Sequence, residues 1–260
     1  MVLPGFANGF MGAGAGAYSP EAEAYFAAMT TQPSNARKTL INNLIVGLIA
    51  DGVWSKLDWL CLMAAHAEQA GRLNAKNPTK ALTAFNSPTF TTDLGFTGNG
   101  STSYLSTGEA PSGSGRQYTQ NDAHFSVWKN STNTGSSPDL GGSEANIRLN
   151  PNWGGTNGIV RVNTNTDSGL PIASFTKGFA CASRYSSGLT RVLVNTYYEG
   201  SYNSPSSAIT TQTSITILRM QTQYSSSRLS MFSSGGALSE DEMKDLRDRS
   251  STYLTAIGAD

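Results

Sequence analysis

Paired carboxylates are the first groups to look for, because two of them on one strand face hydrolyse glycosidic bonds. Such a pair lies at positions i and i+2, since alternate residues of a strand share a face. No two acidic residues between residues 90 and 200 have that spacing. The acidic residues in this part of the chain are Asp93, Glu109, Asp122, Asp139, Glu144, Asp167 and Glu199. We therefore assign no catalytic residue and predict that the chain is not an enzyme. We expect Glu144→Gln, Glu199→Gln and Asp139→Asn each to leave function intact, because none of these residues has a partner carboxylate on its strand.

Histidine, cysteine and glycine motifs add no other chemistry. His124 would be the base of a Ser-His-Asp triad, but no nucleophile-elbow motif accompanies it. His66 lies in a segment predicted to be helical, where a packed or surface role is expected. The two histidines and two cysteines lack zinc spacing, and no phosphate-binding loop is present. Asp139 or Asp167 could bind calcium together with loop carbonyl groups, but no residue spacing indicates such a site. Neither a metal nor a cofactor is therefore expected.

Glycan binding would need aromatic side chains exposed for stacking on sugar rings. The aromatic residues considered for this role are Trp128, Trp153, Tyr197, Tyr198 and Tyr202. The alternative interpretation is that Trp128 and Tyr197 belong to the core and that the others pack against loops. Trp153, Tyr198 and Tyr202 are retained as the candidate ligand-binding residues.

The charge of the chain limits its partners. Lys plus Arg and Asp plus Glu both number 18, so the net charge is zero, and neither nucleic acid nor an anionic membrane is an expected partner. Charged residues make up only 14%, against about 25% in ordinary soluble domains. Cys61 and Cys181 lie in apolar contexts, which favours two buried reduced thiols over one disulfide.

The first 18 residues form a Gly- and Ala-rich segment without the basic and apolar regions of a signal peptide. Its spaced apolar residues cannot build a core of their own. They include the docking candidates Leu3, Phe6, Phe10 and Met11. Two interpretations remain open, a disordered tail and an anchor that becomes ordered on a neighbouring subunit.

Helices are predicted in residues 19–80, as a helical arm, and again over residues 239–258. Ser19 and Ser34 are placed to cap the first two helices. The third is predicted over residues 54–71, from apolar residues at helical spacing that include Leu57, Leu60, Cys61 and Ala64. At the C-terminal helix, Ser239 and Glu242 predict a capping box, and an apolar stripe follows them.

Residues 81–260 carry the sheet. Short alternating segments recur from residue 124 to residue 232, separated by clusters of Gly, Ser, Asn and Pro. No amphipathic helix lies between them, so the predicted fold is an antiparallel jelly-roll sandwich followed by the C-terminal helix. The segment Phe90–Leu105, with turns at Gly95 and Asn99-Gly100, is predicted to set the register of the first strands. Residues 72–89 form a polar connection, in which Leu82 and Phe85 are expected to be buried.

Three segments of this sequence resemble a group of phage and prophage structural proteins. They are TAFNSPTFTTDLGFTGNGSTSYLSTG, YTQNDAHFSVW and LSEDEMKDLRDRSSTYLTAIGA. Proteins of this group have a concanavalin A-like (laminin-G-like) jelly roll in their C-terminal part. Similar chains begin with a helical region like residues 36–74, including the segment DGVWSKLDWL.

The resemblance implies a non-enzymatic structural component of a phage particle, in the tail tip, a fibre or the head decoration. The protein would be located in the virion, contact other virion proteins through its N-terminal region and form a homo-oligomer there. The alternative is a receptor-recognition protein that binds host-surface glycan. A glycan depolymerase without the usual carboxylate signature is the third interpretation.

Overall fold

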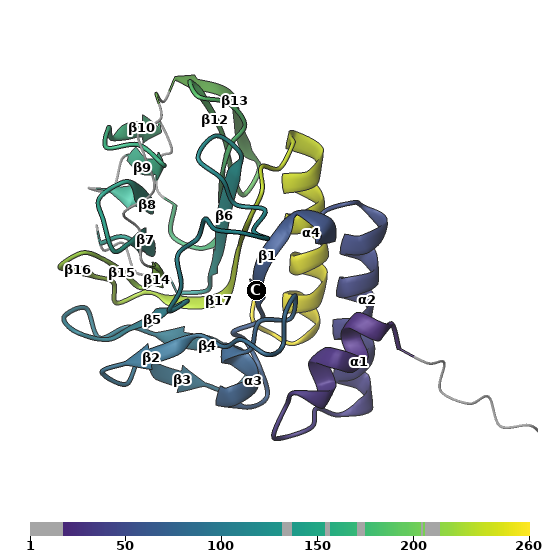
Figure 1. Cartoon of the computed structure of the whole chain (residues 1–260). Helices are drawn as coiled ribbons and strands as arrows, with labels where there is room; N and C mark the ends of the chain where they lie inside the picture. Colours follow the sequence, from purple (N-terminus) through teal and green to yellow (C-terminus); the bar gives the residue numbers. More distant parts are fainter. Residues whose placement is uncertain (1–17, 132–136, 154–156, 171–174, 204, 206–213) are drawn as a thin grey trace, which may run out of the picture.

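The computed structural model of the chain describes residues 18–131, 137–153, 157–170, 175–203, 205 and 214–260. Within these ranges two antiparallel sheets pack face to face. Helices cover the face of one sheet that points away from the other sheet (Figure 1). The predicted fold class is confirmed. The chain is a mainly β antiparallel sandwich with a helical N-terminal region and a C-terminal helix.

The helix-covered sheet has eight strands among the described residues. They are β1 (Leu57–Cys61), β3 (Thr89–Thr91), β4 (Gly95–Thr97), β6 (Ala123–Lys129), β11 (Gly178–Arg184), β12 (Leu189–Val194), β13 (Tyr197–Asn203) and β17 (Arg228–Gly235). Their order is β13-β12-β11-β6-β17-β4-β3, and β1 also pairs with β17. We call this sheet the inner sheet.

The second sheet, here the outer sheet, has seven strands in the described part of the chain. They are β2 (Thr83–Phe85), β5 (Tyr104–Ser106), β7 (Leu140–Gly142), β8 (Ile147–Trp153), β9 (Asn157–Val162), β10 (Ser168–Leu170) and β14 (Ile215–Ile217). Their order is β10-β9-β8-β7-β14-β5-β2. A separate hairpin joins β15 (Arg219–Met220) to β16 (Gln223–Tyr224).

The helices are α1 (Pro20–Ala27), α2 (Asn35–Ala50), the short α3 (Glu68–Arg72) and α4 (Glu240–Ala256), with a 3-10 turn, η1, at Trp54–Lys56. The hydroxyls of Ser19 and Ser34 accept hydrogen bonds from backbone N–H groups in the first turns of α1 and α2. At α4 both hydrogen bonds of the capping box between Ser239 and Glu242 are present, as predicted.

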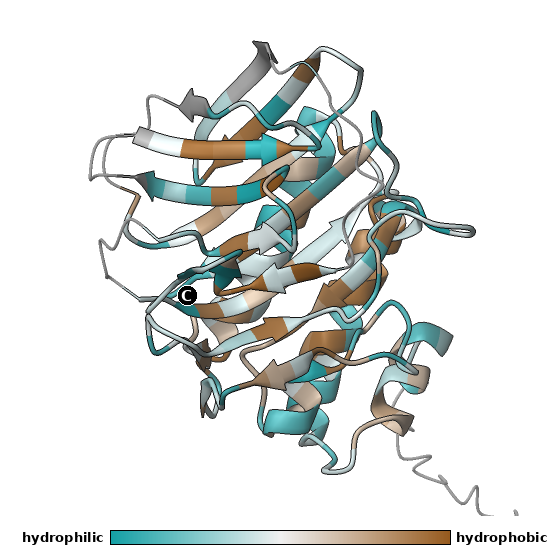
Figure 2. Ribbon diagram, turned by 60° about the vertical axis from the view of Figure 1, so that its left-hand side comes forward, coloured by the Kyte–Doolittle hydropathy of each residue, from teal (hydrophilic) through white to brown (hydrophobic). Residues whose placement is uncertain are grey.

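Alternation along the strands builds the core between the sheets. On β6, Phe125 and Val127 point toward the outer sheet, where they meet Leu149 on β8 and Ile215 and Ile217 on β14. These side chains are almost completely buried. Figure 2 shows the corresponding alternation of hydrophobic and hydrophilic residues along the strands.

A second core lies between the helices and the other face of the inner sheet. Trp128 and Phe179 on that face belong to the same apolar cluster as Leu48 of α2 and Leu254 of α4. The helices α1 and α2 therefore pack on the sandwich through this core. The predicted division into an anchor, an arm and a sandwich stays a prediction.

The predicted third helix is wrong over most of its length. The segment Leu57–Cys61 is strand β1, which pairs with β17 inside the inner sheet. Leu57 and Leu60 face the helix-side core, whereas Trp59 and Cys61 face the core between the sheets. A strand that is buried on both faces has no polar alternation, so its apolar residues mimic helical spacing.

The segment Phe90–Leu105 carries the chain from one sheet to the other. It includes most of β3 and all of β4 in the inner sheet, and then most of β5 in the outer sheet. Gly95 has a positive φ of 109°, and a Cβ there would lie 2.0 Å from the carbonyl oxygen of Leu229, so only glycine fits beside β17. The Asn99 side chain accepts hydrogen bonds from the N–H groups of the following turn.

Both cysteines, Cys61 and Cys181, are buried free thiols, as predicted. Burial raises the pKa of each thiol well above its usual value, which keeps both protonated. The docking candidates Leu3, Phe6, Phe10 and Met11 lie outside the described residues. In the ranges that the structure covers, no helix combines the length and the apolar character needed to cross a membrane.

Candidate functional site

Two aromatic rings stand on the solvent-facing side of the outer sheet. Phe85 on β2 and Tyr104 on β5 are opposite each other in the ladder. Their rings are stacked, with centroids 4.7 Å apart and planes only 5° from parallel. Phe85 is 40% exposed, an unusual exposure for a large apolar side chain. This pair is an aromatic surface that the solvent can reach.

Strand alternation explains why these rings face outward. Leu105, the middle residue of β5, is fully buried between the sheets, so its neighbours Tyr104 and Ser106 must point the other way. On β2 the middle residue, Ala84, packs toward the same core and turns Phe85 outward. The sequence around two short strands therefore creates the exposed pair.

Arg219, at the start of the β15–β16 hairpin, covers the other side of Tyr104. Its guanidinium carbon lies 4.4 Å from the Tyr104 ring centroid and 5.5 Å from that of Tyr224, so it makes cation–π contacts with both. Its Nε donates a hydrogen bond to the carbonyl of Gln221 at 2.5 Å. Its terminal nitrogens have no hydrogen-bond partner within the described residues, and they remain available as donors.

These groups line a hollow of about 340 Å³, which we call the aromatic groove. Besides the aromatic and guanidinium groups, small polar residues line it. They are Ser106, Gly108, Ser143, Ser214 and Thr216. The Thr216 hydroxyl donates to the backbone carbonyl of Arg219 at 2.7 Å and lies 3.2 Å from that of Gly141, which fixes the floor of the groove. The groove thus joins an aromatic wall to hydroxyl groups and cationic donors.

The three aromatic residues chosen from the sequence do not form this groove. Tyr198 lies on β13 of the inner sheet, where it is half-buried against the helix-side core with the Lys244 ammonium 5.9 Å from its ring centroid. Trp153 and Tyr202 lie in β8 and β13, but their side chains are outside the described part of the structure. Their role in binding stays a prediction.

Phe85 and Tyr104 were missed because their positions carry no strong signal. Phe85 was expected to be buried, and it is instead among the most exposed apolar residues of the described chain. The usable signal was the pattern Tyr104-Leu105-Ser106, in which a buried leucine separates an aromatic residue from a hydroxyl. Which strand pairs with it could not be read from the sequence, because β5 also pairs with β14, more than a hundred residues away.

His124 has a serine neighbour that sequence reasoning missed. Its Nε2 lies 3.3 Å from the Ser233 hydroxyl, which in turn lies 2.7 Å from the hydroxyl of Ser126. Its Nδ1 contacts the carbonyl oxygen of Gly236. All three side chains are fully buried below α4, so no substrate reaches this pair in the structure. The cluster ties β6 to β17.

We expect this buried histidine to make stability fall in acid. Burial lowers the pKa of His124 to about 4, assisted by Lys56, while the Gly236 carbonyl, Glu242 and Asp122 act in the opposite direction. The unfolded chain, with a pKa near 6.5, binds the proton first, so stability is complete above about pH 6.5 and declines as the pH falls toward 4.

The measurement is urea unfolding at pH 7.5 and pH 4.5. His124 should account for about 2–3 kcal/mol of the loss between these values, and His124→Gln should remove that part of the pH dependence. Equal pH dependence in the wild-type protein and His124→Gln would contradict the assignment.

Several of the acidic residues considered for catalysis or calcium are paired with cationic side chains. Asp167 pairs with Arg161 at 2.6 Å, and the buried carboxylate of Asp139 lies 3.6 Å from the Lys129 ammonium. Glu109 accepts from Lys80 and Arg116, and these hydrogen bonds hold the pKa of its carboxyl below the usual value despite desolvation. Across the described ranges, no three His, Cys, Asp or Glu side chains gather in a way that could hold a metal ion.

The fold has relatives among solved structures. No family model and no curated protein matches this sequence. Trypanosoma rangeli sialidase with 2,3-difluoro-KDN has 12% identity and a TM-score of 0.52, covering 86% of this chain and 40% of that chain. The same sialidase with sialic acid has 14% identity and a TM-score of 0.51, covering 85% and 40%. Domain 4 of AbnA, a GH43 extracellular arabinanase from Geobacillus stearothermophilus in complex with arabinotriose, has 14% identity and a TM-score of 0.46, covering 74% and 98%.

The similarity to the sialidase shows the fold, and this chain spans about 40% of the sialidase's length. It also corrects a prediction. The expectation that the chain is not an enzyme is wrong, because structures of a glycoside hydrolase share its fold. The i, i+2 spacing on one strand was too narrow a criterion, because glycoside hydrolases need two carboxyl groups at a suitable distance in space, whatever their spacing in the sequence.

Proposed function

We propose that this protein binds glycan in the aromatic groove. The observation that carries the proposal is the exposed stack of Phe85 on Tyr104, with Arg219 on the other side of Tyr104. The C–H groups on one face of a sugar ring pack on an aromatic ring, and its hydroxyls need donors and acceptors beside that ring. Arg219 supplies N–H donors, and Ser106 and Ser214 supply hydroxyls.

The fold supports this proposal in a general way. A solved structure with the same fold is a sialidase in complex with sialic acid. A carboxylate-bearing sugar would suit the Arg219 guanidinium, which binds carboxylates through two parallel hydrogen bonds. Acidic glycans therefore belong in the test beside neutral ones, and bound glycans should also be assayed for cleavage.

The test is a glycan array probed with the whole protein, followed by affinity measurements on its hits. Phe85→Ala should weaken binding at least about tenfold, since the lost aromatic contact contributes on the order of 1.4 kcal/mol or more. Ile49→Ala is the matched control, because Ile49 on α2 is equally exposed, at 40%, and lies outside the groove. The proposal fails if no glycan binds or if Phe85→Ala binds its hits as tightly as the wild-type protein.

The particle setting stays a prediction from the sequence resemblance. It comprises a place in the virion, docking through Leu3, Phe6, Phe10 and Met11, and a homo-oligomeric state. A glycan-binding groove on the sheet opposite the helices would be compatible with display from a particle. Deletion of residues 1–18 that leaves a folded protein but abolishes incorporation into particles would support the docking role.

A further inference from the structure

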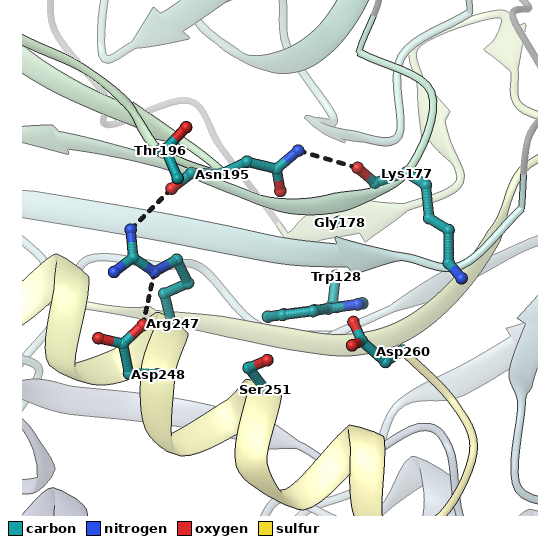
Figure 3. Close-up of a pocket in the computed structure, with 9 residues that line it drawn as sticks. All are labelled: Trp128, Lys177, Gly178, Asn195, Thr196, Arg247, Asp248, Ser251 and Asp260. Carbon is teal, nitrogen blue, oxygen red and sulfur yellow. Dashed lines mark hydrogen bonds and ion pairs between the residues drawn. The ribbon is translucent and has the colours of Figure 1, made fainter.

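A second hollow, of about 370 Å³, lies between α4 and the adjoining ends of β6, β11 and β12. Trp128 forms its floor, and Lys177, Asn195, Arg247 and Asp260 are among the residues around it (Figure 3). We call it the Trp128 hollow. It lies on the helix side of the inner sheet, whereas the aromatic groove lies on the outer sheet.

One wall of the hollow is fixed by hydrogen bonds. The Asn195 amide accepts from the Phe179 N–H at 2.9 Å and donates to the Lys177 carbonyl at 3.0 Å. Gly178 makes this arrangement possible, because a Cβ there would lie 2.0 Å from the Asn195 Oδ1. Arg247 donates to the Asn195 carbonyl at 2.8 Å and to Asp248 at 2.7 Å. The polar groups of this wall are therefore already satisfied.

Two donors at the other end of the hollow have no partner. The Trp128 indole N–H is buried and makes no hydrogen bond, although the side chain is only 4% exposed. A buried donor without an acceptor is rare in folded proteins, because burial removes it from water. The exposed Lys177 ammonium likewise forms no ion pair or hydrogen bond within the residues that the structure describes.

The Asp260 carboxylate lines the same hollow but forms no hydrogen bond or ion pair with these two donors. In Figure 3 the nitrogen end of the indole ring points toward the end of the hollow where the Asp260 carboxylate and, farther out, the Lys177 ammonium lie. Asp260 accepts a hydrogen bond from the Thr255 hydroxyl at 2.9 Å, and it forms no ion pair with Lys177. The three groups therefore lie at one end of the same hollow, where the polar groups of a ligand could meet them.

Hydroxyl groups fit this end of the hollow best. A hydroxyl accepts a hydrogen bond from an indole or ammonium N–H while it donates its own proton to a carboxylate. A ligand carboxylate would satisfy the donors but would be repelled by Asp260, and an amine would satisfy only Asp260. The charged side chains around the hollow, Lys177, Arg247, Asp248 and Asp260, also sum to zero and give no preference for an ionic ligand.

We propose that the Trp128 hollow binds a neutral sugar unit, with its hydroxyls held by Trp128, Lys177 and Asp260. The hydroxyls of Thr196 and Ser251 also line the hollow and supply further hydrogen bonds. This site is separate from the aromatic groove and does not depend on glycan binding there. The chain would then contact carbohydrate at two places on different faces.

The indole N–H of Trp128 gives a direct readout. In the ¹⁵N-labelled protein each tryptophan gives one indole signal, and loss of a signal in Trp128→Phe assigns it. D-glucose, D-galactose and D-mannose are titrated separately, with dissociation constants on the order of 1–10 mM expected for a single sugar unit. At least one of them should move the Trp128 signal in a saturable way. If Trp128→Phe does not fold, contacts to neighbouring protons assign the signal in the wild-type protein.

Variants and a charged analogue make the test specific. Lys177→Met and Asp260→Asn should each weaken the binding at least about fivefold, and Lys38→Met is the matched lysine control outside the hollow. D-galacturonic acid, which carries a carboxylate where galactose carries a hydroxymethyl group, should bind more weakly than galactose. The proposal is overturned if none of the three neutral sugars moves the signal, or if galacturonic acid binds more tightly than galactose. Binding in the aromatic groove has no direct effect on this indole, so failure of either proposal can be distinguished from failure of the other.

Discussion

Asp139→Asn is expected to lower the free energy of unfolding by about 3–5 kcal/mol, because it leaves the Lys129 ammonium buried without its carboxylate. Both residues of this ion pair are about 1% exposed. Asp139 also accepts a hydrogen bond from the Ser225 hydroxyl at 2.9 Å, and its backbone bonds to Leu149 and Leu218. The pair joins the end of β6 in the inner sheet to the start of β7 in the outer sheet. The sequence-based expectation that this substitution leaves function intact is a separate question and stays a prediction.

Chemical unfolding of three variants tests this prediction. Glu68→Gln is the control, since Glu68 and Arg72 form an exposed i, i+4 pair 3.7 Å apart that should contribute under about 0.5 kcal/mol. The double variant Lys129→Met/Asp139→Leu should recover most of the loss, because two apolar side chains leave no buried charge. A loss below about 1 kcal/mol in Asp139→Asn would show that the pair is not buried as described.

Leu254→Ala is expected to cost about 2–5 kcal/mol, through lost burial and the cavity left behind. Leu254 is fully buried on α4, in the core that α4 shares with α1, α2 and the inner sheet. Leu246 and Tyr253 lie on the same buried face of the helix. The helix therefore covers the sandwich, and this role was predicted from its apolar stripe.

Thermal and urea unfolding of the isolated protein measure this effect. Thr252→Ala is the matched control, because Thr252 is exposed on the same helix and should change stability by under about 0.5 kcal/mol. Ser239→Ala should fall between the two, at about 1 kcal/mol, through loss of the cap. An unchanged melting temperature in Leu254→Ala would make α4 an interface element rather than part of the core.

The sequence predicted α4 well because several local signals agree there. Ser239 and Glu242 define the first turn, and the apolar stripe fixes which face is buried. The prediction of a helix at Leu57–Cys61 failed because local signals there do not define the structure. One face is buried by the helices and the other by the outer sheet, which are built largely from distant parts of the sequence. No local pattern distinguishes such a strand from a helix.

The candidate site was harder to predict than the fold. Phe85, Tyr104 and Arg219 meet only because two three-residue strands pair and a distant hairpin folds over them. The aromatic residues chosen from the sequence came from longer and more obvious strands, and Tyr198 packs against the helix-side core. Alternation tells which residues share a face. It does not tell which face meets solvent.

The central claim, that the aromatic groove binds glycan, is tested most directly by mapping where the glycan contacts the protein. The ¹⁵N- and ¹³C-labelled protein is titrated with the strongest hit from the glycan array, and the signals of all assigned residues are followed. Our account predicts that the ring signals of Phe85 and Tyr104 and the guanidinium signal of Arg219 shift and saturate together. Saturable binding that leaves these three side chains unchanged and shifts residues elsewhere would contradict it.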